Sequence, residues 1–309
     1  MKILVTGGAG FIGSNVVDEY LNLGHEVVIV DNLITGKKEN INPKAKFIKF
    51  SITDKNLFKI FEEEKFDLVN HHAAQIDVRK AVEDPAFDAN VNVIGLINVL
   101  QNCIKYKVKK VIYISSGGAI YSINAPMPAD ENTLAKPLSP YGITKLTGEH
   151  YLYFYNKVHG LKFTTLRYSN VYGIRQDPLG EAGVCAIFSN LMSKNKQPTI
   201  YGNGKQTRDY IFVKDVVQAN VLSLKKGDNQ AFNIGTGKET SVNELFNTMK
   251  EFTEYKNDPN YADARSGEVL RSCLNINKAK EILGFKPKFS LKEGLKQTIE
   301  WVKIINQNN

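Results

Sequence analysis

Residues 2–13 read KILVTGGAGFIG, an apolar run that leads directly into closely spaced glycines. Gly8, Gly10 and Gly13 follow the G-x-G-x-x-G order, and Gly7 stands directly before them. Glycine is needed where the chain turns tightly, where backbone N–H groups approach a pyrophosphate, and where a helix packs closely on a strand. The order of strand, glycine turn and helix therefore predicts a nucleotide-binding unit at the start of the chain.

The acid at the end of the next apolar run selects among nucleotides. Asp31 closes the β-branched run 26–31, about 20 residues beyond the glycines, as the dinucleotide-binding pattern requires. A carboxylate there accepts hydrogen bonds from both ribose hydroxyls and repels a 2′-phosphate, so the pattern favours NAD over NADP. The alternative, a glycine-rich turn in an α/β protein that binds no nucleotide, leaves Asp31 unexplained.

The first two-thirds of the chain repeat this alternation of strand and helix. Further short apolar runs lie at 46–50, 68–71, 110–115 and 162–167. Helical patterns lie at 13–23, 54–64, 86–105 and 141–159. Strands that are apolar throughout and alternate with helices predict an α/β fold, a doubly wound parallel Rossmann-like sheet covered on both faces.

After Tyr172 this pattern ends, and Gly, Pro and Asn become frequent, which predicts loops and short elements. A strand returns at 231–235, and Ser241 with Glu244 predicts the capping box of a following helix. We therefore expect an NAD-binding domain at 1–172 with a returning segment at 213–240. Residues 173–212 and 241–309 are expected to form a smaller, interleaved substrate-binding lobe.

The composition of the chain argues against a membrane protein and against a nucleic-acid-binding protein. The chain has 309 residues, 42% hydrophobic and 23% charged, which is ordinary for a globular protein. No stretch approaches the roughly 20 apolar residues of a membrane helix, and no export signal is recognised, so we expect a cytoplasmic protein without a membrane partner. The formal charge of +8 comes from lysines scattered among acids, which argues against nucleic acid and suits a small anionic ligand.

Neither cysteines nor histidines indicate a metal site. Cys103, Cys185 and Cys273 form no C-x-x-C pair, so neither zinc nor a disulfide framework is expected. His71 and His72 are neighbours at the end of an apolar run, and adjacent residues on a strand point to opposite faces. We interpret them as packing residues near the cofactor.

Tyr141 and Lys145 form a candidate catalytic pair, because a spacing of four places both on one face of a helix. A phenol is a weak base at its ordinary pKa of about 10, but a nearby ammonium and a cationic nicotinamide ring favour the phenolate. Taken alone, Tyr-x-x-x-Lys is common, and two unrelated residues on a surface helix explain it equally well. With the glycine turn and Asp31 present, the catalytic interpretation is favoured.

With these residues in place, the chain resembles the extended short-chain dehydrogenase/reductase family, and within it the UDP-glucose 4-epimerases of the NAD-dependent epimerase/dehydratase family. The matching motifs span nearly the whole chain. They are the glycine turn, His71-His72-Ala73-Ala74-Gln75, Asn92-x-x-Gly95, residues 115–121, Tyr141-x-x-x-Lys145, residues 167–173, Arg208-Asp209-Tyr210, residues 233–235 and Arg265-Ser266-Gly267-Glu268.

The resemblance implies that Tyr141 takes the proton of the sugar 4-hydroxyl and that Lys145 also holds the nicotinamide ribose. It implies an NAD site made of Gly7, Gly10, Phe11, Ile12, Gly13, Asp31, Asn32, Ile52, Ala73, Ala74 and Asn92 together with Tyr141 and Lys145. It implies a UDP-sugar site made of Asn170, Arg208, Arg265, Glu268 and Ser272. Two arginines suit a diphosphate, since guanidinium–phosphate contacts are strong and directional; a surface ion pair is the alternative for each.

Several positions depart from the family pattern. Gly117 stands where the family places a catalytic Ser or Thr, so either Ser116 or a water supplies that hydroxyl. Ser51 replaces an acid that the family often has near the adenine. Gly118 and Ala119 stand where dehydratases carry an Asp-Glu pair, which leaves no acid and base for elimination.

We therefore expect NAD-dependent C4 epimerisation of a UDP-hexose through a 4-keto intermediate. The alternatives are another UDP-sugar epimerase, such as a UDP-glucuronate 4-epimerase, and a non-catalytic NAD-binding protein of the same fold. Intact Tyr141 and Lys145 disfavour the second alternative. Ser272 stands where a tyrosine in the family narrows the pocket, so tolerance of N-acetylhexosamines is expected.

The resemblance also implies a homodimer. Its interface would be a bundle of the helices within 86–105 and 141–159 of both subunits. The apolar residues on these helices are either interface or ordinary domain core: Phe87, Val91, Ile94, Ile97 and Leu152.

Overall fold

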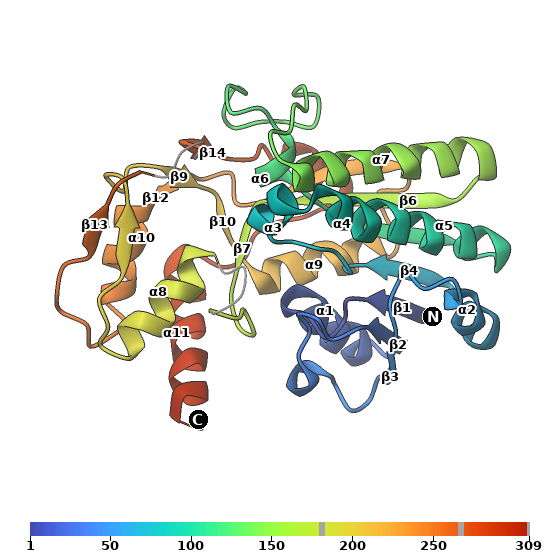
Figure 1. Cartoon of the computed structure of the whole chain (residues 1–309), viewed down its shortest axis with the longest axis horizontal. Coiled ribbons are helices and arrows are strands. Elements are labelled where there is room, and N and C mark those ends of the chain that lie inside the picture. Colours follow the sequence, from blue (N-terminus) through green and yellow to red (C-terminus); the bar gives the residue numbers. More distant parts are fainter. Residues whose placement is uncertain (179–182, 265–268, 308–309) are drawn as a thin grey trace.

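The computed structural model describes residues 1–178, 183–264 and 269–307. Within these residues, seven strands form one parallel sheet in the order β11-β6-β5-β4-β1-β2-β3 (Figure 1). The strands are β1 (Lys2–Thr6), β2 (Glu26–Asp31), β3 (Lys46–Lys49), β4 (Leu68–His71), β5 (Lys110–Ser116), β6 (Lys162–Tyr168) and β11 (Gln230–Ile234). The strand order reverses between β1 and β4, so ligands are expected at the carboxyl ends of these strands. The predicted doubly wound α/β fold is confirmed.

Helices cover both faces of the sheet (Figure 1). On one face, α1 (Phe11–Asn22) and α9 (Val213–Ser223) pack together over a cluster that contains Ile3 and Val5. On the other face, α2 (Leu57–Glu64), α5 (Gly95–Lys105) and α7 (Pro140–His159) pack over a cluster that contains Leu4. Successive side chains of β1 thus pack on opposite faces of the sheet. Both faces are buried, which is why Ile3, Leu4 and Val5 are all apolar.

Two helical patterns differ in detail from the expectation. The pattern at 86–105 is interrupted, and comprises α4 (Pro85–Ala89), a π-helical turn η2 (Asn90–Ile94) and α5, with α3 (Val78–Glu83) before it. The pattern at 54–64 becomes helical only at Leu57. Asp54 precedes that helix in a turn, where its carboxylate accepts the Asn56 N–H at 2.7 Å.

The apolar residues on the helices of the expected interface divide into two groups. Leu152 is 1% exposed and belongs to the core of the sheet domain, so of the two alternatives the second holds for this residue. Phe87 and Ile94 are 43% and 53% exposed, and so are not core residues. On α7, Ile143, Phe154 and Val158 are exposed to a similar degree.

The second part of the chain forms a smaller lobe beside the sheet (Figure 1). Its short strands pair as β7 (Asn170–Tyr172) with β10 (Tyr210–Phe212), β8 (Thr199–Tyr201) with β13 (Asn260–Ala262), and β9 (Thr207–Arg208) with β12 (Thr240–Ser241) and β14 (Arg271–Ser272). Its helices are α8 (Val184–Ser193), α10 (Val242–Lys250) and α11 (Leu291–Gln307). They enclose an apolar cluster that includes Phe188, Phe246 and Leu295. Ser241 and Glu244 form the predicted capping box of α10.

Short helical segments complete the fold: η1 (Lys38–Asn40), α6 (Gly117–Ile120) and η3 (Ala279–Leu283). Two ion pairs join the lobe to the glycine-turn region. Arg175 contacts Asp18 of α1 at 2.7 Å, and Asp177 contacts Lys37 at 2.9 Å. The lobe is therefore anchored beside the first helix.

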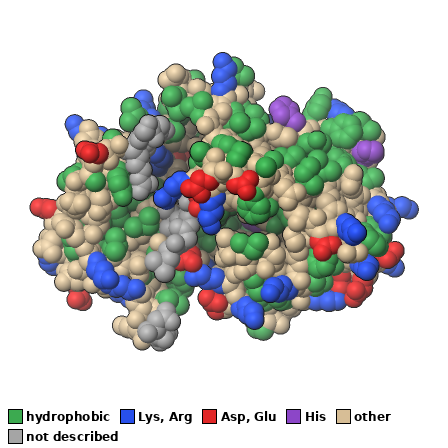
Figure 2. Space-filling view, in the orientation of Figure 1, with side chains coloured by type: hydrophobic (Ala, Val, Ile, Leu, Met, Phe, Trp, Pro, Cys, Tyr) green, Lys and Arg blue, Asp and Glu red, His purple; other side chains and the backbone are tan. Residues whose placement is uncertain are grey.

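Figure 2 shows lysine and arginine side chains dispersed over this face among aspartates and glutamates, in agreement with the scattered lysines of the sequence. None of the helices in the described ranges combines the length and apolar character that a bilayer span requires. The described residues also contain no group of three or more His, Cys, Asp or Glu side chains that could hold a metal ion.

Candidate active site

The glycine turn is closed by backbone packing. Gly7 has a φ of +71°, and a Cβ there would lie 2.6 Å from the Ala73 backbone nitrogen. A Cβ at Gly13 would lie 2.3 Å from the Gly7 carbonyl oxygen. The turn therefore fits only glycine at both positions, and it lies against the segment that carries Ala73 and Ala74 beyond β4. Phe11 and Ile12 open α1, with Gly10 as its N-cap, so the helix presents its unpaired N–H groups at this edge.

Asp31 lies at the end of β2 and faces the glycine turn. Its carboxylate is buried and accepts the N–H groups of Ala9 at 3.0 Å and Leu33 at 2.8 Å. A carboxylate has about four lone-pair sites, so both oxygens can still accept a ribose hydroxyl. The two backbone bonds fix its orientation, as a ribose-binding acid requires.

Two other predicted cofactor residues lie near this acid. Asn32 is in the loop after β2, where its side chain accepts the Ile34 N–H at 3.1 Å. Ile52 is buried after β3 and packs against Gly95, where a Cβ would come within 2.7 Å of the isoleucine Cδ1. The Ile52 side chain thus contributes to the apolar core of this edge of the sheet.

Tyr141 and Lys145 lie on α7, which begins at Pro140 with Ser139 as its N-cap. The Lys145 ammonium is buried and donates to the Ile114 carbonyl at 2.9 Å. It lies 5.7 Å from the centre of the Tyr141 ring and 5.4 Å from that of Tyr113. Burial lowers the pKa of Lys145 to about 8, while the charge of Asp88 acts in the opposite direction. The predicted pairing of a phenol with an ammonium on one helix face is present.

His71, the last residue of β4, and His72, which follows it, are uncharged packing groups. His71 Nδ1 lies 2.9 Å from the Thr6 hydroxyl, and its ring stacks on Tyr113. Burial, reinforced by the charge of Lys145, lowers the pKa of both His71 and His72 to about 3. Neutral imidazoles beside Lys145 add no charge to the site.

The end of β5 explains the unusual Gly117. A Cβ at Gly117 would lie 2.6 Å from Cδ1 of Leu274, whose side chain is buried. The space of a Ser or Thr side chain at this position is therefore filled by Leu274. Ser116 is the last residue of β5 and the N-cap of α6, one residue from that position.

The three predicted substrate residues that the structure describes, Asn170, Arg208 and Ser272, lie on neighbouring short strands. Arg208 and Ser272 are direct partners in the parallel pairing of β9 with β14. Asn170 begins β7, and its N–H donates to the Asp209 carbonyl at 2.9 Å. A Cβ at Gly118 would lie 3.8 Å from Asn170 Oδ1, so the amide lies next to the start of α6. Arg265 and Glu268 lie outside the described residues.

The buried Asp209 links the chain next to β9 to the segments that carry Thr236 and Leu274. Its carboxylate accepts the N–H and hydroxyl of Thr236 at 2.8 and 2.6 Å, and the Gly237 N–H at 3.1 Å. It also accepts the Leu274 N–H at 3.3 Å. Burial raises the pKa of Asp209, and these hydrogen bonds oppose that effect. The residue next to Arg208 thus anchors both β9 and the Leu274 segment.

Sequence reasoning missed a buried polar cluster behind α7. Asn92, predicted to bind the cofactor, uses its amide inside the protein. Its Oδ1 accepts the Gln75 N–H at 2.8 Å, and its Nδ2 donates to Asp88 at 3.0 Å. Asp88 is fully buried and also accepts the Thr144 hydroxyl at 2.7 Å. The four-residue spacing of Asp88 and Asn92 on one helix was the available signal.

A second missed group is the ion pair of Glu149 and Arg167, whose closest atoms are 2.6 Å apart. Glu149 also accepts the Ser115 hydroxyl at 2.6 Å, and Arg167 donates to the Tyr121 hydroxyl at 2.9 Å. The pair links α7, β5, β6 and the chain beyond α6. It fixes the strand end that carries Ser116.

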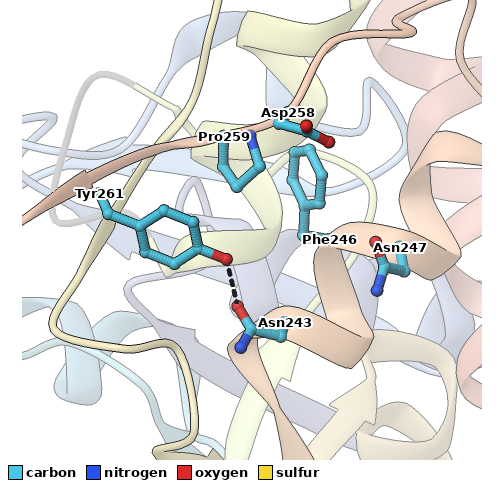
Figure 3. A pocket seen from close by; sticks show the side chains of 6 residues that line it. All are labelled: Asn243, Phe246, Asn247, Asp258, Pro259 and Tyr261. Carbon is cyan, nitrogen blue, oxygen red and sulfur yellow. Dashed lines mark hydrogen bonds between the residues drawn. The ribbon is translucent and has the colours of Figure 1, made fainter.

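A separate cavity of about 390 Å³ lies on the outer side of the lobe (Figure 3). It is lined by Asn243, Phe246, Asn247, Asp258, Pro259 and Tyr261. The Tyr261 hydroxyl donates to Asn243 Oδ1 at 3.2 Å across it. None of the predicted site residues within the described ranges lines this cavity.

Comparisons with known proteins agree with this geometry. The model of the NAD dependent epimerase/dehydratase family matches residues 3–235. The UDP-glucose 4-epimerase of Mycolicibacterium smegmatis is 41% identical over 313 residues, which cover 99% of this chain and 100% of the relative.

Two solved structures are similar over nearly the whole chain. The UDP-glucose 4-epimerase of Thermotoga maritima, solved with UDP-glucose, superposes with a TM-score of 0.98 at 50% identity, covering 99% of this chain and 100% of that one. The Thermus thermophilus UDP-glucose 4-epimerase, solved in complex with NAD, has a TM-score of 0.93 at 40% identity, covering 98% and 99%.

Proposed function

The chain belongs to the NAD dependent epimerase/dehydratase family, and on this basis we propose that it interconverts the C4 epimers of a UDP-hexose. UDP-glucose and UDP-galactose are the proposed pair, with a 4-keto sugar between them. The observation that carries the proposal is the buried Lys145 ammonium beside Tyr141, at the carboxyl end of the parallel sheet.

The residues present fit NAD. Backbone contacts that exclude any side chain at Gly7 and Gly13 leave a bare turn for a pyrophosphate, next to the N–H groups of α1. Asp31 is held by two hydrogen bonds at the end of β2, where the dinucleotide-binding pattern has the acid that binds the adenosine ribose. When bound, NAD supplies a reversible hydride acceptor for C4 of the sugar.

Tyr141 and Lys145 supply the acid–base chemistry. The phenolate of Tyr141 accepts the proton of the 4-hydroxyl, and the phenol returns it when the sugar is reduced on its other face. The ammonium of Lys145 favours the phenolate over the phenol, because a positive charge in a buried site attracts a nearby negative charge strongly. Ser116 supplies the hydroxyl that the family places at position 117, where Leu274 leaves no room.

The same strand end disfavours other reactions of the family. Gly118 and Ala119 lie in α6, where dehydratases carry an acidic pair. Without an acid at these two positions, the leaving hydroxyl is not protonated there and water is not eliminated. The 4-keto sugar is instead reduced again to a hexose. A UDP-glucuronate 4-epimerase, which needs the same Tyr and Lys, remains the second candidate.

The diphosphate and the sugar are assigned to the lobe. Arg208 and Arg265 bind the diphosphate, and Asn170 and Glu268 complete the site. The small, buried Ser272 lies directly beside Arg208 and leaves room for a substituent at C2 of the sugar. We therefore include UDP-N-acetylhexosamines as tolerated substrates. We propose an NAD-binding domain at 1–172 with 213–240 and a substrate lobe at 173–212 with 241–309. The strand β7 pairs with β10 where the two meet, and Leu274, Leu283 and Phe285 of the last range pack in the apolar cluster of the sheet.

We also propose a cytoplasmic homodimer. Phe87 and Ile94 follow one stripe of the α4–α5 segment, and Ile143, Phe154 and Val158 follow a stripe of α7. The two segments pack against one another. Exposed apolar side chains in this arrangement suit a four-helix bundle with a second copy.

A coupled assay with purified protein tests the function. Conversion of UDP-galactose to UDP-glucose without added NAD, with NAD in the supernatant of the denatured protein, is the expected result. Failure to convert UDP-galactose together with turnover of UDP-glucuronate would instead favour the second candidate.

A further inference from the structure

A buried carboxylate lies behind the helix that carries the catalytic pair. Asp88, near the end of α4, is 0% exposed. Its Oδ2 accepts the Thr144 hydroxyl at 2.7 Å, and its Oδ1 accepts the amide groups of Gln75 at 2.9 Å and Asn92 at 3.0 Å. These partners all donate hydrogen bonds, which suits an ionised carboxylate, an acceptor at both oxygens.

The donors tie Asp88 to three parts of the site. Thr144 directly precedes Lys145 on α7, Gln75 follows Ala73 and Ala74, and Asn92 lies in the π-helical turn. A buried polar group is costly unless its bonds are complete, so three bonds from separate elements hold this carboxylate in one place.

Lys145 needs a compensating charge, because burial lowers its pKa to about 8 even with the charge of Asp88 acting in the opposite direction. The groups around its ammonium are Tyr113 on β5, Tyr141 on α7, and the histidines at the end of β4, His71 and His72. The histidines are neutral, and Lys145 itself lowers their pKa. Asp88 is the acid whose charge raises the pKa of Lys145.

We propose that Asp88 is a positioning residue that keeps Lys145 charged, acting from behind α7 through its own negative charge and touching neither cofactor nor substrate. Only the effect of Asp88 on turnover rests on the proposed function, in which Lys145 takes part in catalysis. The charge of Asp88 acts on Lys145 whether or not a sugar is bound.

The test compares Asp88→Asn with Thr144→Val in the NAD-loaded protein. Asp88→Asn removes the charge with little change of shape, whereas Thr144→Val removes the hydrogen bond at 2.7 Å and keeps the charge. The alkaline limb of the kcat profile is expected to move to lower pH by roughly one unit in Asp88→Asn. It is expected to stay in place in Thr144→Val.

A second readout needs no turnover. Lys145 has a pKa of about 8 in the fold, below its value in the unfolded chain, so stability rises with pH as the folded form loses its proton. Asp88→Asn lowers the pKa of Lys145 in the folded protein further. The variant is therefore less stable than the parent at pH 7, and this difference disappears at a pH where Lys145 is neutral in both folded proteins. The Tm deficit of Asp88→Asn should therefore shrink by roughly half or more between pH 7 and about 9.5. That of Thr144→Val should stay constant.

The outcomes separate the explanations. A Tm deficit independent of pH in Asp88→Asn, with an unmoved alkaline limb, would show that Asp88 only supports the fold and would overturn the proposal. Equal shifts in both variants would assign the effect to the hydrogen bond and also overturn it. If Asp88→Asn does not fold, Asp88→Ser takes its place with the same expectations. If the parent protein does not turn over UDP-galactose, the proposed function is contradicted. The pH dependence of the Tm deficit still tests whether the charge of Asp88 acts on Lys145.

Discussion

The Lys145 ammonium donates a hydrogen bond to the Ile114 carbonyl oxygen at 2.9 Å, which ties the middle of α7 to the end of β5. A lysine side chain has many rotamers, and this bond selects one of them. The ammonium is thereby held near the Tyr141 ring, at the sheet edge where the glycine turn and Asp31 also lie. The bond therefore fixes the pairing of ammonium and phenol on which the proposed acid–base chemistry depends.

Tyr141→Phe should lower kcat by several orders of magnitude and leave the affinity for UDP-sugar nearly unchanged. The phenol acts on the reacting hydroxyl, whereas the diphosphate and uracil supply most of the binding. Steady-state kinetics and equilibrium titration with UDP-galactose measure the two effects. Tyr153→Phe is the matched control, because Tyr153 lies on the same helix and is 59% exposed. A Tyr141→Phe protein with near-normal kcat would mean that another group is the base.

Gly117→Ser should destabilise the protein by about 1–3 kcal/mol, because the new side chain meets the buried Leu274. Gly118→Ser is the matched control, since a Cβ there has only ordinary contact with Asn170 at 3.8 Å. Urea unfolding of the two variants and the parent measures the difference. Equal stability of both serine variants would show that the space at Gly117 is open, and Ser116 would lose its claim as the hydroxyl donor.

The dimer proposal predicts that Ile94→Glu yields a monomer, because a carboxylate in the apolar stripe opposes burial. The parent should have about twice the chain mass of 34.6 kDa in light scattering at micromolar concentration. Ile304→Glu is the control, since Ile304 on α11 is 57% exposed, like Ile94 at 53%, but lies outside the stripe. A parent protein of single-chain mass would refute the dimer.

Ser272→Tyr should reduce kcat/KM for UDP-N-acetylgalactosamine by at least about tenfold, because a phenol ring narrows the pocket at C2. UDP-galactose is the internal control and should change by less than a few-fold. The ratio of the two kcat/KM values is the measurement. Equal loss with both sugars would place Ser272 elsewhere than at the C2 substituent, since the ring would then obstruct every hexose.

Much of the fold could be predicted from the sequence, since its signals are local. The strands at 26–31 and 68–71 and the capping box at Ser241 appear as expected, because each depends on neighbours in the chain. The π-helical turn at Asn90–Ile94 could not be seen, because the apolar spacing continues through it. Leu152 and Phe154 look alike in the sequence, and only packing decides that the first is core and the second exposed.

The candidate site divides in the same way. Tyr141, Lys145, Asp31 and the glycine turn could be predicted, because their chemistry depends on short spacings. The spacing of Asp88 and Asn92 indicates that the two are neighbours, but the burial of Asp88 could not be predicted, since an acid within a helical pattern is ordinarily exposed. Its burial depends on Gln75 and Thr144, which are distant in the sequence and meet only in the fold.

Hydride return within one closed site is the central claim, and isotope retention measures it directly. UDP-galactose deuterated at C4 would be converted by the purified protein in ordinary water, and the product analysed by mass spectrometry. The account predicts UDP-glucose that keeps its deuterium at C4, because the same hydride leaves and returns. Loss of deuterium to solvent would mean that the C4 hydrogen leaves as a proton, and it would contradict the account.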